Sequence, residues 1–150
     1  MKRLHIHVSV DDLFQSIRFY SALFGREPTK QRSDYAQWRL DNPKVNFAIS
    51  ARGAKAGIDH LGIQVEEAGE LEEVRARLKK ADLAIFAEGE TTCCYARSDK
   101  TWVKDPSGLA WEAYQTLAEA AFFDEADVNA AACCAPDMAR AETPVKCGCC

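Results

Sequence analysis

The sequence predicts an α+β fold built from two copies of one small module, and three observations support this prediction. The first is an internal repeat at an offset of 55 residues, in which "HIHVSVDD" (5–12) aligns with "HLGIQVEE" (60–67). The second is that each copy alternates like a half-buried strand and then continues into a helical pattern. The third is that short strand-like runs, separated by turn residues, follow each helical pattern.

The first copy predicts a strand, a helix and two further strands within a module of about residues 1–53. Asp12 can cap the helix at its start, and Gly25 is typical of a helix end. Apolar residues at helical spacing lie between them: Leu13, Ile17, Phe19, Tyr20, Leu23 and Phe24. The runs "YAQWRL" (35–40) and "VNFAIS" (45–50) flank "DNPK", which predicts a turn between two strands.

The second copy repeats this order within a module of about residues 54–115. Leu71, Val74 and Leu78 predict its helix, and "LAIFA" (83–87) predicts the next strand. "TWVK" and "LAWEAY" are joined by "DPSG", a hairpin signal. We therefore expect a largely antiparallel sheet. The pattern leaves open whether the modules pair within one chain, as in a monomer, or exchange between the chains of a homodimer.

Residues 116–150 have a different composition and are expected to form an acidic, Ala- and Cys-rich tail. Acidic residues outnumber basic ones there, so this segment accounts for the net charge of −4. The stretch "LAEAAFFDEAD" (117–127) is compatible with a short helix. Beyond about residue 128 the periodicity is lost, and we expect disorder.

Composition excludes several classes of function. A pI near 5.4 argues against a nucleic-acid or anionic-membrane partner. The apolar runs are shorter than the roughly 20 residues that a membrane span needs. The start, "MKRLHIHVSV", lacks the apolar region of a signal peptide. These observations predict a cytoplasmic location.

The seven cysteines are expected to remain free thiols, because their number is odd and the cytoplasm is reducing. Five of them fall in the tail, where they suit capture of soft metal ions better than core packing. A dispensable appendage is the alternative for these five: Cys133, Cys134, Cys147, Cys149 and Cys150.

Strand alternation predicts a metal centre. His5 and His60 occupy equivalent positions of the repeat and point away from the expected core. Glu112 points the same way from an otherwise apolar strand. Two imidazoles and one carboxylate on one surface are the donor set of the facial triad of non-haem Fe(II) enzymes. Another divalent metal ion is also compatible with these donors.

Three further side chains are expected near this surface without a direct role. His7 shares the strand face of His5 but aligns with Gly62 in the repeat. We therefore interpret it as a residue that supports or lines the site, and a role as a metal ligand is the less favoured alternative. Tyr95 and Tyr114 are candidates for lining the same pocket.

Residues 1 to about 115 resemble the glyoxalase/extradiol-dioxygenase superfamily, which has the vicinal oxygen chelate fold. The segment "DLFQSIRFYSALFG" resembles the end of the opening strand–helix unit, and "DHLGIQV" resembles the start of the second module. "VKDPSGLAWEAY" resembles the closing hairpin, whose glutamate binds metal in that superfamily. The resemblance implies two βαβββ modules around a metal-binding cleft. It implies the same ligands, His5, His60 and Glu112.

The segment "TTCCYARSDKTWVKDPSGLAWEAY" narrows the resemblance to the ArsI carbon–arsenic lyases and the cadmium-induced CadI proteins. The resemblance implies Fe(II)- and O₂-dependent cleavage of trivalent organoarsenicals such as methylarsenite, releasing arsenite. Cys93 and Cys94 would bind the arsenical, because trivalent arsenic is soft and prefers thiolate ligands. The Cys-rich tail is also similar to tails of this group.

Two alternatives remain open from the sequence. One is a non-catalytic protein that sequesters cadmium or arsenite on the same fold. The other is a different dioxygenase, or a thiol transferase, since one fold supports many reactions.

Overall fold

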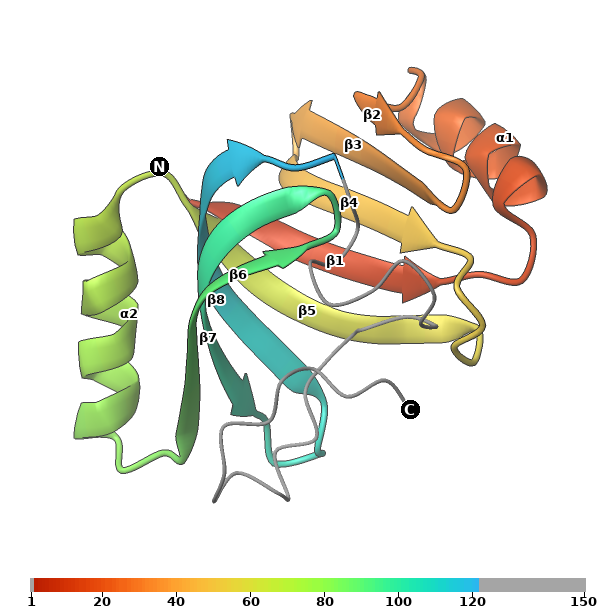
Figure 1. Ribbon diagram of the computed structural model, residues 1–150. Coiled ribbons are helices and arrows are strands. Elements are labelled where there is room, and N and C mark those ends of the chain that lie inside the picture. Colours follow the sequence, from red (N-terminus) through yellow and green to blue (C-terminus); the bar gives the residue numbers. More distant parts are fainter. Residues whose placement is uncertain (1, 122–150) are drawn as a thin grey trace.

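The computed structural model describes residues 2–121 and confirms the predicted α+β fold, with one curled eight-stranded sheet and two helices outside it (Figure 1). The elements are, in chain order, β1 (Arg3–Ser9), α1 (Leu13–Phe24), β2 (Lys30–Gln31), β3 (Tyr35–Asp41), β4 (Lys44–Ser50), β5 (Gly57–Val65), α2 (Ala68–Lys80), β6 (Ile85–Cys93), β7 (Ala96–Lys104) and β8 (Ala110–Glu119). None of the helices in this part of the chain is both long and apolar enough to cross a membrane.

The two modules meet along the antiparallel pair formed by β1 and β5. The strand order is β2-β3-β4-β1-β5-β8-β7-β6, so each module contributes four neighbouring strands. β1 pairs with β4 in parallel, and β5 pairs with β8 in parallel, which repeats one arrangement on the two sides of the seam. Both modules belong to one chain, so a single chain brings the two repeats together.

Helix α1 lies between the two capping residues that the sequence predicts, Asp12 and Gly25. The Asp12 side chain accepts a hydrogen bond from the backbone N–H of Gln15 at 2.9 Å, and Gly25 ends the helix with a φ of 66°. The apolar side of α1 packs against the outer face of the first module. Its ring contacts include Tyr20 with Phe47, whose centroids are 4.5 Å apart.

Helix α2 covers the outer face of the second module. Leu71 and Val74 are buried against Val65 and Ala113. Basic residues in its last turn interact favourably with the negative end of the helix dipole. The outer face of each module is therefore an ordinary apolar core between a helix and the sheet.

The inner face of the sheet is different, because it buries charged and polar side chains. His5, His60, Lys100 and Glu112 are each no more than 5% exposed, and His7 is fully buried. Burying such groups is unfavourable unless they are paired or bind a ligand. The inner face is therefore not a hydrophobic core, and its buried charged groups indicate a functional site.

Two elements differ from their expected bounds. β8 continues through Glu119, so the first four residues of the expected tail (116–119) lie in the sheet, and the helix expected over 117–127 does not begin there. The extension follows from pairing with β7, which reaches back to the register Ala96–Glu119. β6 also runs beyond "LAIFA" and ends at Cys93. Residues 122–150, with the tail cysteines, lie outside the described residues.

Gly62 is required for the close contact between β5 and β8. A Cβ atom built there would lie 2.7 Å from both the Cγ atom and the backbone oxygen of Glu112. We predict that Gly62→Ala lowers the free energy of unfolding by about 1–3 kcal/mol, the usual cost of overpacking. Chemical denaturation of the metal-free protein measures this change.

Gly69→Ala in α2 is the matched control. A Cβ atom at Gly69 meets nothing within 4 Å, and alanine is the better helix former. This control should be neutral or stabilising by up to about 1 kcal/mol. Equal effects of the two substitutions would contradict the steric role of Gly62.

Candidate metal centre and thiol pair

His5, His60 and Glu112 converge on the inner face, as strand alternation predicts. The Nε2 atoms of His5 and His60 lie 3.3 Å and 3.4 Å from the same oxygen, Oε1 of Glu112. Donors that share one ion at about 2.1 Å are about 3.0–3.4 Å apart in octahedral or tetrahedral geometry. The distance of each Nε2 atom from the Glu112 oxygen therefore fits donors that share one metal ion.

The other ring nitrogen of each histidine is held so that Nε2 faces this point. His5 Nδ1 lies 3.0 Å from the backbone oxygen of Asn46, and His60 Nδ1 lies 2.5 Å from Oδ1 of Asp59. Nδ1–H donates in each pair, so Nε2 is the nitrogen that can bind an ion, in His60 after it loses its proton. This arrangement is typical of metal-binding histidines, whose second nitrogen is fixed by a carbonyl or a carboxylate.

Asn46 links the His5 support to the rest of the inner face. Its side-chain amide donates to the Tyr114 hydroxyl at 2.7 Å and to Gln64 Oε1 at 3.1 Å. Gln64 in turn donates to Thr116 at 3.2 Å. This buried network joins β4, β5 and β8. It fixes the position of Asn46, whose backbone oxygen contacts His5.

The electrostatic surroundings of the two histidines differ. Burial lowers the pKa of His5 to about 4, and the attraction of Glu112 offsets this only in part. Burial also opposes a charge on His60, but Glu112 and the hydrogen-bonded Asp59 outweigh it and raise its pKa to about 9. Positive charge is therefore favoured at the point between His60 and Glu112, which is where a metal cation would be held.

Lys100, which sequence reasoning did not single out, lies on the other side of Glu112. Its Nζ atom is 3.2 Å from Oε2 of Glu112, and both side chains are buried. Burial opposes ionisation of Glu112, but Lys100 and His60 hold its pKa well below the usual range. The carboxylate is thus kept charged, with Oε1 directed to the histidines. Alternation along β7 places Lys100 on the inner face with Ser98 and Trp102, but its contact with Glu112 depends on the register of β7 with β8.

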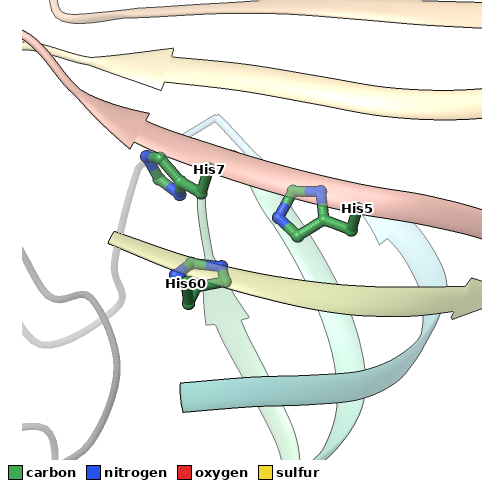
Figure 2. A group of neighbouring side chains, drawn as sticks. All are labelled: His5, His7 and His60. Carbon is green, nitrogen blue, oxygen red and sulfur yellow. The ribbon is translucent and has the colours of Figure 1, made fainter. Parts of the chain in front are cut away.

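His7 lies beside the triad rather than at a distance from it. The donor atoms of His5, His7 and His60 all lie within 4.8 Å of one another, and these three could hold a metal ion. Figure 2 shows their rings gathered between strands β1 and β5. His7 Nε2 is 2.9 Å from the Ser50 hydroxyl, and burial lowers the pKa of His7 to about 3.

Cys93 and Cys94 lie at the end of the β6–β7 hairpin. Cys93 pairs with Ala96, so Cys94 and Tyr95 form a two-residue turn, and their φ values are 57° and 60°. Two positive φ values define a type I′ turn, which normally contains Asn-Gly or a similar pair. The turn places the two sulfur atoms 3.3 Å apart, and both side chains pack against the cluster formed by Tyr35, Ala48 and Tyr95.

Contacts of Tyr95 with the first module compensate for the strained turn. Its hydroxyl donates to Asp34 at 2.5 Å, and its ring lies under the guanidinium of Arg32 at 5.4 Å. Its backbone oxygen accepts from Lys30 at 3.3 Å and from the Ala120 amide at 3.0 Å. The hairpin of the second module is therefore fastened to the first module, over the inner face.

The thiol pair and the metal centre share one electrostatic environment. The hydrogen bond from Cys94 lowers the pKa of Cys93, and the charge of Lys100 lowers it further against the effect of burial. The hydrogen bond to Cys93 and burial raise the pKa of Cys94. Cys93 is therefore the more acidic thiol of the pair, and the charge of Lys100 acts on it as well as on Glu112.

The chain matches the model of the Glyoxalase/Bleomycin resistance protein/Dioxygenase superfamily over residues 2–113. It is similar in fold to homoprotocatechuate 2,3-dioxygenase from Arthrobacter globiformis, with a TM-score of 0.58 and 18% identity. That likeness covers 81% of this chain and 38% of the dioxygenase chain.

Two curated relatives are much more similar in sequence. A trivalent organoarsenical cleaving enzyme from Thermomonospora curvata is 39% identical over the full length of both chains. The cadmium-induced protein CadI from Mycobacterium tuberculosis is 36% identical over 89% of this chain and 93% of its own. The chain belongs to the glyoxalase/dioxygenase superfamily and, within it, to the group of the organoarsenical cleaving enzymes and CadI proteins.

Proposed function

We propose that this protein cleaves the carbon–arsenic bond of trivalent organoarsenicals such as methylarsenite, with Fe(II) at His5, His60 and Glu112 and O₂ as the second substrate. Arsenite and an oxidised carbon fragment would be the products. The observation that carries this proposal is the position of the thiol pair, which packs against Tyr35 and Ala48, the residues that adjoin His7 on the inner face. The similarity to the Thermomonospora curvata enzyme supports the same reaction.

Cys93 and Cys94 bind the arsenical in this proposal. The trivalent arsenic of methylarsenite carries two hydroxyl groups, and each is exchanged for one sulfur with release of one water molecule. No oxidation or reduction occurs in this step. The thiolate of Cys93, which the hydrogen bond from Cys94 and Lys100 stabilise, is the first nucleophile. Adjacent thiols on a rigid turn then close the second As–S bond at low entropic cost.

The triad positions the metal, which supplies O₂ activation when bound. Asn46 and Asp59 orient the two imidazoles, and Lys100 keeps Glu112 ionised. The inner face limits the access of water to the two imidazoles, Lys100 and Glu112, since each of these is buried. Holding both reactants beside each other is the main contribution of the protein, because proximity alone can lower a barrier by several kcal/mol.

One chain contains every residue that this mechanism uses, so we propose that a monomer is sufficient for activity. We place the protein in the cytoplasm, where the thiols remain reduced. A second candidate function is sequestration of cadmium or arsenite without turnover, and the similarity to CadI favours it. The tail cysteines would serve that function by capturing soft metal ions.

We predict that Cys93→Ser and Cys94→Ser each lower arsenite release from methylarsenite by at least 100-fold while Fe(II) affinity stays within about threefold. A serine oxygen is a poor ligand for soft arsenic, and neither thiol contributes to the triad. The assay separates arsenite from methylarsenite by chromatography after incubation with Fe(II).

The same assay under argon distinguishes the two candidate functions. Arsenite release that requires air supports the lyase. Stoichiometric binding of methylarsenite in air, without release of arsenite, would show that the protein sequesters the arsenical and does not cleave it. Retained cleavage in both serine variants would exclude the thiol pair as the arsenical site.

Metal binding should release about one proton near pH 7.5. His60, with its pKa raised to about 9, is protonated there in the metal-free protein and must lose that proton to bind an ion. His5, with its pKa near 4, is already neutral. Affinity for Co(II) should therefore rise about tenfold per pH unit from pH 7 towards pH 9 and then level off.

Calorimetry in buffers of different ionisation enthalpy counts the released protons. Asp59→Asn is the control, because it removes a hydrogen bond and a charge that raise the pKa of His60. The variant should release clearly less than one proton at pH 7.5. Equal release by both proteins would mean that the proton does not come from His60.

Removal of residues 128–150 should leave the rate of arsenite release within about twofold. The triad and Cys93 and Cys94 all precede this segment. If the tail captures soft metals, the shortened protein should bind fewer Cd(II) ions, as measured by equilibrium dialysis. An unchanged Cd(II) stoichiometry would argue that the tail cysteines have no such role.

A further inference from the structure

We propose that His7 is a fourth protein ligand of the metal centre, so that the chain offers three imidazoles and one carboxylate. This inference rests on the proposed metal site and extends its ligand set beyond His5, His60 and Glu112. It also revises the expectation from the repeat, in which the lack of a histidine at position 62 argued against a ligand role for His7.

The first support is the placement of the three rings. His7 and His60 face each other across the β1–β5 pair, with ring centroids 4.9 Å apart. His5 lies 5.2 Å from His60 and 6.3 Å from His7, so His60 is the middle ring of the three. Figure 2 shows all three rings on the same side of the two strands.

The second support is the distance between the donor atoms, which are all within 4.8 Å of one another. Ligands on opposite sides of one ion, each bonded at about 2.1 Å, are about 4.2 Å apart. Three nitrogens around one octahedral ion include at most one such opposite pair, and the other pairs are about 3.0 Å apart. Bringing His7 into the set therefore requires the nitrogen atoms to approach one another by up to about 1.8 Å, through rotation of the imidazole rings.

The third support is a buried nitrogen of His7 that has no hydrogen-bond partner among the described residues. His7 is fully buried, and its Nε2 atom is engaged with the Ser50 hydroxyl. Its Nδ1 atom, in contrast, has no hydrogen bond. A buried polar atom without a partner is unfavourable by about 1–3 kcal/mol, and a metal ion at Nδ1 would remove this cost.

The fourth support is the relation of the two modules. In the repeat, His7 is equivalent to Gly62, and each is paired with a residue on the parallel neighbouring strand: His7 with Ala48 and Gly62 with Glu112. In the second module, the donor Glu112 on β8 lies beside Gly62 on β5. In the first module, the donor His7 on β1 lies beside Ala48 on β4. Ala48 has no donor atom in its side chain, so His7 supplies the donor on this side.

Four protein ligands would leave two positions of an octahedral ion open. A nitrogen-rich set also favours the later divalent metals of the first row more strongly than a set with two imidazoles. His7 is therefore a residue that tunes metal affinity and selectivity, and it need not contact the arsenical.

The test is proton NMR of the full chain loaded with Co(II). A histidine bound to Co(II) through one nitrogen gives a strongly shifted, exchangeable signal from the N–H of the other nitrogen. Those N–H groups are shielded here by Asn46, Asp59 and Ser50. Three such signals are expected in H₂O and none in D₂O. His7→Phe, which keeps a ring of similar size, should show two.

Competition with a chelator should show at least tenfold weaker Co(II) binding by His7→Phe. His5→Phe is the comparison, because it removes a proposed triad ligand from the same strand face. If His7→Phe does not fold, the number of signals in the unmodified protein still decides. Two signals there, or unchanged signals and affinity in His7→Phe, would overturn the role of His7 while leaving the triad intact. A protein that binds no Co(II) would overturn the proposed metal centre as well.

Discussion

The antiparallel pairing of β1 with β5 is the constraint on which the rest of the inner face depends. It sets His5 opposite Gly62 and His7 opposite His60, so the three imidazoles come within reach of one another. The parallel partner of each strand then brings its own side chains to the same place, Asn46 from β4 and Glu112 from β8. A shift of one residue along this seam would place His5 and His7 on the opposite face from His60 and Glu112. Backbone hydrogen bonding between two repeats therefore defines the chemistry of the centre.

Charge balance is the second requirement of this buried face. Glu112 lies between two histidines and Lys100, and Asp59 supports His60 from behind. Removing one member would leave an opposite charge buried and unpaired, which costs more than the pair contributes. The thiols are part of the same balance, because Lys100 acts on Cys93 as well as on Glu112. The proposed metal and thiol sites thus share the influence of one lysine.

Sequence reasoning located the donors that depend on local periodicity and missed those that depend on register. Alternation along single strands placed His5, His60 and Glu112 on one face, and capping signals located α1. Lys100 was missed because its contact with Glu112 requires the β7–β8 register, which no local pattern encodes. The turn at Cys94 and Tyr95 was missed because neither residue is typical of a type I′ turn, and long-range contacts of Tyr95 stabilise it instead. The length of β8 likewise depends on its partner strand.

Ala48 has a consequence for the direction from which a substrate can approach. Two equal repeats around a pseudo-twofold axis would surround an ion evenly, with no preferred side. Here the position equivalent to Glu112 holds only a methyl group, within the cluster of Tyr35, Ala48 and Tyr95 against which Cys93 and Cys94 pack. The second module thus presents a carboxylate to the inner face, and the equivalent part of the first module presents a surface that the thiols cover. The proposed centre therefore has two chemically different sides.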